Sequence, residues 1–575
     1  MEQARYDKKW VIAVCVMVFI VGFLVYANTI GNDFIWDDEY LILNNSQIKS
    51  FIHIGNVFKT YVGYGSENIN NFYRPIQEIS NMIDYFLWGE YSFGFHLTNV
   101  ILHALVGVMV FLFLFYLAGD ILTAAVAALF YVVHPVHSEA VAYVAGRADS
   151  LYSLFMLISL VFFIKFSDSA RSGKADYPKY ALSVCFFIVS LLSKEIIITM
   201  PLLIFLYMFY FLKGTEADAV YKKLKWYWVP YAAIVVVYGY LRLTVLDFSD
   251  IAPQSVFVKI PLVYRLLTFF RTILVYFRLM LFPTGLHMER AISISRDLLH
   301  PQGLFALAVI LALVAVAVAT YRKNRLVSFS IAWFFANLLP VSNIIPINSF
   351  LAEHWIYTAS IGPFLLLGMA FSRIYYGIVP AKVWYRLATV VFLAVLIGAY
   401  ARGTVLRNMD WKDEITFFNS TLKYHPRNAR LYLNLGNTYY ERGEIDQAIE
   451  QYQKAININK KYAVAYGNIG SAYLHKKDAD KAEEYLTVAI KLKQNYPIAH
   501  YNLGIVYFQK RKYEDALKEL QIATEQLPQL FQAWNMTART YLKLKDRERA
   551  KEAFSRSLAI MPDQPPVKRA LEKLK

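Results

Sequence analysis

Long apolar runs recur along this chain from its start to about residue 402, and a charged, mixed sequence follows. The first run, Trp10–Ile30, is about 20 apolar residues long, which is enough for a helix to cross a bilayer. It is longer than the core of a signal peptide, so we interpret it as an uncleaved first span. Further spans are expected near 97–118, 121–136, 149–166, 180–193, 196–212, 227–245, 303–320, 327–345, 355–372 and 387–402.

Positive charge decides which apolar runs count as spans. The stretch 262–283 carries Arg265, Arg271 and Arg278, and an arginine at the bilayer centre costs about 2.5–3.5 kcal/mol. These arginines equally suit a helix on the lipid surface that binds anionic head groups. Without this stretch the chain has about eleven spans. The basic segments then all fall on the side of Lys8 and Lys9: 165–179, 213–225, 321–325 and 373–386.

Basic loops stay in the cytoplasm, so this count predicts a cytoplasmic N-terminus. The first outer loop, 31–95, and the region after residue 402 then lie outside the cytoplasm. We expect a multi-pass protein of a bacterial inner membrane, or of the endoplasmic reticulum if the source is eukaryotic.

A period of 34 residues marks the region after residue 427. Small residues and tyrosine recur in register at Gly436, Gly470, Gly504 and Ala538, at Tyr439, Tyr473, Tyr507 and Tyr541, and at Ala448, Ala482, Ala516 and Ala550. Small residues at these positions let paired helices approach closely, which is the tetratricopeptide (TPR) pattern. We expect a linker and half-repeat over 403–427 and four TPR repeats over 428–563, stacked into an α-solenoid with a concave face. Residues 564–575 form a tail or a capping helix.

Composition agrees with a membrane protein. Apolar residues make up 57% of the chain and charged residues 18%, and the net charge is +16. In a membrane protein a basic total indicates cytoplasmic loops, and no nucleic-acid partner is expected. Cys15 and Cys185 both lie in apolar runs and define no disulfide framework.

Three consecutive acids, Asp37, Asp38 and Glu39, follow the first span within a few residues. A carboxylate at a membrane surface has a desolvation cost, so the carboxylates found there mostly take part in chemistry or bind ions. Other polar turns interrupt apolar sequence on the same predicted face, at 134–149, 194–195, 246–302 and 343–354. This convergence predicts a reaction at the outer membrane face.

Simpler interpretations of these residues stay open. The three acids also suit a solvated loop or a helix N-cap. His134, His137 and Glu139 have a spacing that suits zinc, but a full site needs a further ligand. Lys194 and Glu195 also suit an ion pair with each other at the interface.

The ordered set of motifs resembles the transmembrane and TPR-containing (TMTC) O-mannosyltransferase-like proteins over essentially the whole chain. The motifs are Phe34-Ile35-Trp36-Asp37-Asp38, Tyr73-Arg74-Pro75, His96-Leu97-Thr98-Asn99, His134-Pro135-Val136-His137-Ser138-Glu139, Gly146-Arg147-Ala148-Asp149, Ser193-Lys194-Glu195 and Ala352-Glu353-His354-Trp355. His354 stands where the family usually carries arginine. The resemblance implies an all-α, GT-C-type transmembrane catalytic domain over 1–402, and a sugar donor linked to polyprenyl phosphate.

A phosphate is a good leaving group, so one carboxylate acting as base on the acceptor hydroxyl is enough for an inverting displacement. The resemblance assigns that base to Asp37. Asp38 and Glu39 are second candidates for the site, either to bind a metal or to orient the acceptor. A divalent cation at Asp37 and Asp38 is an open alternative. Phosphate charge requires fixed cations near the membrane. The residues expected to bind the donor phosphate are Arg74, His137, Glu139, Arg147, Lys194, Arg271 and His354.

Asparagine recurs on the first helix of three repeats, at Asn434, Asn468 and Asn502, while Met536 breaks the series. Such a ladder can hydrogen-bond the backbone of an extended polypeptide without reading its sequence, and it resembles the ladder of cytosolic O-GlcNAc transferase. Asparagine that is simply common at this repeat position explains the series equally well.

Three functions compete. In the first, the membrane half is a glycosyltransferase that moves a sugar, such as mannose, onto a polypeptide recruited by the TPR repeats. In the second, the membrane half is an anchor for a TPR scaffold. In the third, the enzyme acts on a glycan or a lipid. The outer-face acids with matching cations favour the first.

Overall fold

Helices account for the regular structure of the residues that the computed structural model describes, which are 7–66, 70–215, 217–248, 256–290, 292–297, 300–347, 349–377 and 383–574. No strand occurs among them, which confirms the all-α class. The chain divides into two compact units, Met1–Asp413 and Glu414–Lys575, and each is described by itself.

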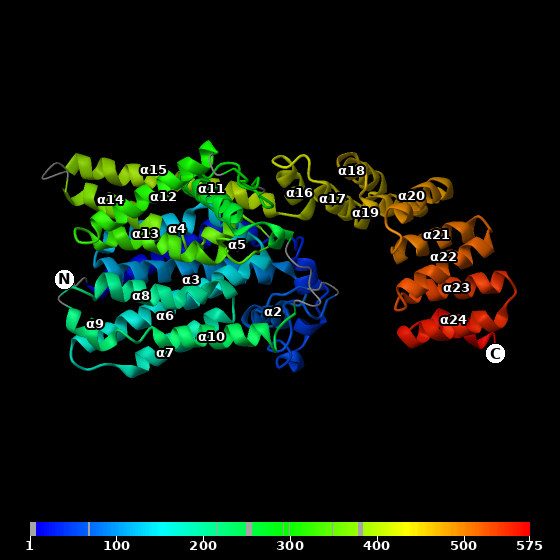
Figure 1. Cartoon of the computed structure of the whole chain (residues 1–575), viewed down its shortest axis with the longest axis horizontal. Helices are drawn as coiled ribbons and strands as arrows, with labels where there is room; N and C mark the ends of the chain where they lie inside the picture. The colour runs from blue at the N-terminus through cyan, green and yellow to red at the C-terminus, as the bar shows by residue number, and fades with distance from the viewer. Residues whose placement is uncertain are drawn as a thin grey trace. The chain divides into compact units, whose positions relative to one another are not determined.

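The N-terminal unit is a bundle of apolar helices (Figure 1). Its helices are α1 Lys8–Tyr26, α2 Pro75–Trp88, α3 Ser92–Ala118, α4 Ile121–Val133, α5 Ser138–Ala142, α6 Arg147–Arg171, α7 Tyr177–Leu191, α8 Met200–Phe211, α9 Asp218–Leu224, α10 Val229–Leu243, α11 Leu262–Leu281, α12 Pro301–Thr320, α13 Arg325–Leu338, α14 Ile361–Gly377 and α15 Val383–Asn408.

The centre of the bundle is built around α3 and α4. Helix α3 packs against α1, α4 and α6, and α14 packs against α4. The α3–α4 crossing is so close that a Cβ added at Gly107 would collide with the side chain of Val132. Most of α4 is buried in this core, which explains why its sequence is apolar on every side.

A helix lies in each apolar run that the sequence marked as a span. Among the described residues, five helices are long and apolar enough to cross a membrane by length and composition. They are Lys8–Thr29, Ser92–Ala118, Val144–Arg171, Pro301–Thr320 and Trp384–Trp411, and the bent pair Ile121–Val133 with Pro135–Ala142 makes six. Several other helices are apolar but shorter, so the count of eleven spans stays a prediction.

The two ends of the bundle carry different kinds of segment. Figure 1 shows α9 and the link between α6 and α7 at one end, and α2 and α5 at the other. The first end holds basic segments and the second holds the first outer loop with its acids. The loop with the three acids therefore lies at the end of the bundle that holds α2 and α5.

The C-terminal unit contains the repeats. Helix α16 (Glu414–Leu422) precedes four pairs and α25 (Pro565–Glu572) follows them. The pairs are α17 Ala429–Glu441 with α18 Ile445–Ile458, α19 Ala463–His475 with α20 Ala479–Leu492, α21 Pro497–Gln509 with α22 Tyr513–Gln526, and α23 Phe531–Lys543 with α24 Arg547–Ile560. A Cβ added at Gly436 would lie 2.5 Å from Cε1 of Tyr452, so the small residue is required for this contact. The predicted TPR architecture is confirmed.

Candidate functional site

The acid segment after α1 has an unusual backbone. Trp36, immediately before Asp37, has a φ of 48°, in the left-handed region that large side chains rarely occupy. A short π-helical turn, Glu39–Leu43, follows the acids. Such local strain concentrates at functional sites and persists only where surrounding contacts enforce it.

Those contacts come from Asp38 and Tyr143. Oδ1 of Asp38 accepts a hydrogen bond of 2.8 Å from the N–H of Ala145, and Oδ2 accepts one of 3.2 Å from the N–H of Ile35. The hydroxyl of Tyr143 accepts a 2.9 Å bond from the N–H of Asp37. Asp38 is fully buried, and this burial raises its pKa well above the usual carboxyl range. Asp38 therefore holds the turn in place.

Asp37 and Glu39 differ from Asp38 in exposure. Asp37 is partly exposed, beside the hydroxyl of Tyr143. Glu39 is exposed and accepts a bond of 3.1 Å from the side chain of Asn44. Asp37 thus combines a fixed backbone with access to solvent, as a general base requires.

Two of the residues expected to bind phosphate, Arg74 and Lys194, form ion pairs with carboxylates of the chain. Nε and Nη2 of Arg74 lie 3.0 and 2.7 Å from the two carboxylate oxygens of Glu195. Nζ of Lys194 lies 2.7 and 2.8 Å from the carboxylate oxygens of Asp149. Lys194 and Glu195 therefore do not pair with each other. Lys194 has extended backbone angles, which direct neighbouring side chains to opposite sides.

Arg147 is fully buried, and each of its three side-chain nitrogens contacts a polar group. Its Nη2 lies 2.6 Å from Oδ2 of Asp84 and its Nε lies 2.8 Å from Oδ1 of Asn99. The remaining bonds go to the side chains of Ser80 and Asn81 and to the carbonyl of Phe95. This arginine joins α2, α3 and α6, and its burial leaves it inaccessible to a phosphate.

His137 and Glu139 are also buried. Nδ1 of His137 lies 2.9 Å from the carbonyl of Tyr131, and Nε2 lies 3.1 Å from Oγ of Ser360. Oε1 of Glu139 lies 2.7 Å from Nδ1 of His354, whose side chain is 25% exposed. Of this group, only His354 can meet a ligand in solvent.

A charged cluster that the sequence did not predict surrounds the neighbouring Glu353. Its Oε1 accepts bonds of 2.8 Å from Nε of Arg290 and from the N–H of His287. Nη2 of Arg407 lies 3.9 Å from its Oε2. The arginines come from segments far apart in the chain, so no sequence spacing signals this cluster.

Helix α11 carries the arginines that excluded it from the spans. Nη1 of Arg265 donates to the carbonyls of Asn343 and Ile344 at 2.6 and 3.0 Å. Nη1 of Arg271 donates to Oγ of Ser295 at 2.8 Å and to the carbonyl of Ser293 at 3.0 Å. Both side chains secure loops of the N-terminal unit.

The acids do not assemble into a metal site with other side chains. No group of three or more His, Cys, Asp or Glu residues placed to hold a metal ion occurs within the described ranges. Both oxygens of Asp38 also accept backbone bonds, so Asp38 is poorly suited as a ligand. No further His, Cys, Asp or Glu side chain of the described residues completes a site at Asp37 and Asp38, and a divalent cation there stays a prediction.

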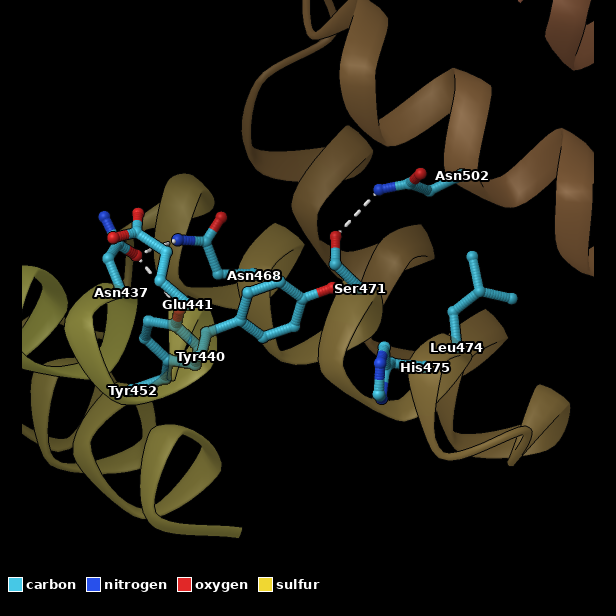
Figure 2. Close-up of a pocket in the computed structure, with 9 residues that line it drawn as sticks. All are labelled: Asn437, Tyr440, Glu441, Tyr452, Asn468, Ser471, Leu474, His475 and Asn502. Atoms are coloured by element: carbon cyan, nitrogen blue, oxygen red, sulfur yellow. Dashed lines mark hydrogen bonds between the residues drawn. The ribbon is translucent and has the colours of Figure 1, made fainter. Parts of the chain in front are cut away.

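The C-terminal unit has a pocket of about 420 Å³ lined by α17, α18, α19 and α21 (Figure 2). Two members of the asparagine ladder, Asn468 and Asn502, line it, whereas Asn434 does not. Nδ2 of Asn468 donates to Oδ1 of Asn437 at 2.8 Å, and Nδ2 of Asn502 donates to Oγ of Ser471 at 2.7 Å. Each of these asparagines therefore contacts the preceding repeat, as the dashed lines in Figure 2 show.

Family models of known proteins match the C-terminal unit. Tetratricopeptide repeat models match 417–450, 473–539 and 531–564, and a TPR repeat model matches 436–477. A crystal structure of MamA is 26% identical and covers 28% of this chain and 92% of its own, with a TM-score of 0.25.

Two curated relatives extend over the N-terminal unit. Protein O-mannosyl-transferase F38B6.6 of Caenorhabditis elegans is 25% identical over 77% of this chain and 62% of its own length. Protein O-mannosyl-transferase TMTC3 of Homo sapiens is 25% identical over 77% of this chain and 51% of its own. The chain thus spans about half to three fifths of the length of these relatives. They confirm the resemblance to TMTC-type proteins that the motifs indicated.

Proposed function

We propose that this chain is a membrane glycosyltransferase that moves mannose from a polyprenyl-phosphate donor to a hydroxyl group of a polypeptide, on the extracytoplasmic face. The single observation that carries the proposal is the position of Asp37. It is a solvent-accessible acid on a strained turn that Tyr143 and Asp38 hold in place. The name shared by its relatives supports a protein O-glycosyltransferase.

Asp37 is the general base of the proposed reaction. The acceptor oxygen attacks C1 of the sugar as the bond between C1 and the phosphate oxygen breaks. The hydroxyl proton passes to Asp37, and polyprenyl phosphate leaves with the electron pair. The phosphate needs little protonation, so the site needs no partner acid. A single displacement of this kind inverts the anomeric centre.

Arg74 and Lys194 stabilise the phosphate charge. Both are cations at the same end of the bundle as the acid turn, and their side chains are 14% and 8% exposed. Arg74 presents a planar fork that fits phosphate oxygens, whereas Lys194 acts as a point charge. We assign His354 to the edge of this site, because it is the accessible member of its motif. Arg147, His137 and Glu139 support the scaffold.

The TPR repeats recruit the polypeptide acceptor. The pocket combines amides and a hydroxyl with Tyr440 and Leu474, so it offers both hydrogen bonds and apolar contact to an extended chain. Recruitment by the repeats raises the local concentration of the acceptor near the membrane face.

The test uses the purified full chain in lipid nanodiscs with polyprenyl-phosphate mannose and an unfolded protein acceptor. Transfer is followed by mass spectrometry of the acceptor. Wild type is expected to add hexose, whereas Asp37→Asn retains donor binding and loses transfer by at least about a hundredfold. Wild-type turnover in Asp37→Asn would remove the base assignment. No transfer to any protein by wild type would favour the scaffold, and transfer to glycan or lipid alone would favour the third function.

A further inference from the structure

Helix α2 of the first outer loop has its polar face turned inward. Gln77, Glu78, Asn81 and Asp84 are each no more than 3% exposed. On the opposite face, Ile83, Phe86 and Leu87 are 46%, 73% and 61% exposed. An amphipathic helix of a water-soluble domain has the reverse arrangement. This inversion requires a surrounding that favours apolar side chains.

Most of the inward polar face is engaged, although Oε1 of Gln77 has no hydrogen-bond partner. Glu78 accepts a 2.8 Å bond from the N–H of Gly63, and Asp84 pairs with Arg147. Oδ1 of Asp84 also accepts a 2.8 Å bond from Oγ1 of Thr98. Buried carboxylates are strongly destabilising unless paired in this way, so rotation of α2 about its axis is prevented. These buried interactions therefore fix the apolar face of α2 outward.

The apolar surface extends beyond α2. The rings of Phe51 and Phe86 lie 5.5 Å apart, and the adjacent Ile52 is 82% exposed. Tyr91, just after α2, is 78% exposed. A contiguous surface of this kind marks a site that contacts another apolar phase.

We propose that α2 and the turn at 51–54 lie in the headgroup boundary of the bilayer, on the outer face. Helix α3 begins at Ser92, a few residues after α2, and is itself long and apolar enough to cross the membrane. The surface is thus continuous with a candidate span. Trp88 and Tyr91 at this junction are the residue types that favour the membrane–water boundary. Helix α2 has 14 residues, about 21 Å, which is too short to cross the hydrocarbon core.

Placing α2 at the membrane boundary also fixes the depth, relative to the bilayer, of the turn that carries Asp37 and Asp38. The side chain of Gln77 on α2 donates a 3.2 Å bond to the carbonyl of Ala145, and the N–H of Ala145 donates to Asp38. One residue therefore links the membrane-lying helix to the turn that carries Asp37. If Asp37 is the base, which rests on the proposed function, this link holds it at the depth of a lipid-linked sugar.

The test measures depth directly, without sugar transfer. Cys15 and Cys185 are replaced by alanine, and single spin labels are introduced at Ile52→Cys, Phe86→Cys and Leu87→Cys in full-length protein in nanodiscs of phosphatidylcholine and phosphatidylglycerol. Leu105→Cys on α3 gives the lipid reference, and Glu450→Cys on α18 gives the aqueous reference. All five positions are exposed, with Leu105 the least so at 38%, so folding should be retained.

Labels at the three test positions are expected to resemble Leu105, with high accessibility to oxygen and about tenfold lower accessibility to a nickel chelate than Glu450. Chelate accessibility equal to that of Glu450 would overturn the proposal. Protection from both reagents would also overturn it, because a protein partner would then cover the surface. Either result leaves the transferase assay untouched, so the two proposals fail separately.

Discussion

The backbone N–H of Ala145 donates a 2.8 Å hydrogen bond to Oδ1 of Asp38, across 107 positions of the chain. This bond fixes the turn after α1 against the turn that precedes α6. Adjacent acids consequently have different tasks: Asp38 builds the turn that presents Asp37.

The first prediction separates those tasks. Asp38→Ala leaves the N–H groups of Ile35 and Ala145 without their acceptor, so the unfolding free energy should fall by about 1–3 kcal/mol per unpaired group. Asp37→Asn should leave it nearly unchanged while transfer is lost. Thermal melting of the purified protein, followed by intrinsic fluorescence, measures the first effect. Equal melting temperatures for wild type and Asp38→Ala would contradict the structural role.

The second prediction concerns the buried pair of Lys194 and Asp149. Lys194→Gln alone strands a buried carboxylate and should lower stability by about 3–5 kcal/mol, and Asp149→Asn alone should do the same. The double variant removes both charges and should melt near wild type. It should still lose transfer, because the phosphate loses its cation. A double variant with full activity would exclude Lys194 from donor binding.

The third prediction tests the asparagine ladder. Alanine at Asn468 and Asn502 removes two amides from the pocket, each worth about 0.5–1.5 kcal/mol, so KM for a protein acceptor should rise about tenfold. Transfer to a short synthetic peptide should change little. Asn434→Ala is the matched control, because it removes an asparagine of the same ladder outside the pocket. Equal losses on peptide and protein, with lower melting, would indicate a damaged solenoid instead.

The fourth prediction concerns pH and the TPR unit. Nδ1 of His500 lies 2.6 Å from Oε2 of Glu519, and Nε2 lies 3.2 Å from the carbonyl of Gln494. Burial lowers the pKa of His500, but these two bonds outweigh it and the pKa is raised. The stabilisation is therefore complete below the unfolded value of about 6.5 and disappears as pH rises through the raised folded value.

Wild type should accordingly lose more stability than Glu519→Gln as the pH rises above the unfolded value of about 6.5. Chemical unfolding of the full chain, with a probe in the repeats, measures the difference. Parallel pH profiles for the two proteins would contradict the assigned interaction.

The fifth prediction is topological. A reporter fused after residue 575 should be extracytoplasmic, and one inserted near Lys174 should be cytoplasmic. The reason is that all basic segments fall on one side of the membrane when α11 does not cross it, and basic loops stay in the cytoplasm. A cytoplasmic C-terminal reporter would mean that α11 crosses the membrane and that the acids and the repeats lie on opposite faces.

Periodicity predicted most of the fold. Apolar runs located the bundle helices, and the 34-residue spacing located the helix pairs, because both signals depend on local sequence. Helix α2 was not predicted. Its polar residues Glu78 and Asp84 face the interior, so its pattern of exposure is the reverse of the usual one.

The sequence named candidate residues for the site but not their tertiary partners, and the roles of these residues stay predictions. The sequence identified Asp37, Arg74 and Lys194 as candidates, but their partners depend on tertiary contacts. Glu195 binds Arg74 across 121 positions of the chain, and no spacing rule predicts such a pair. The same holds for Arg147, whose burial removes it from the list of accessible cations.

The pairing of Arg74 and Lys194 with carboxylates has a consequence for how a phosphate would arrive and leave. The two ion pairs have no net charge, so a phosphate that bound there as proposed would exchange with the carboxylates as counter-ion to the two cations. In the proposed reaction, Glu195 and Asp149 would compete with the phosphate for these cations throughout turnover. The two carboxylates would thereby lower the affinity for the polyprenyl phosphate product. Its release would be faster because the Arg74–Glu195 and Lys194–Asp149 ion pairs re-form.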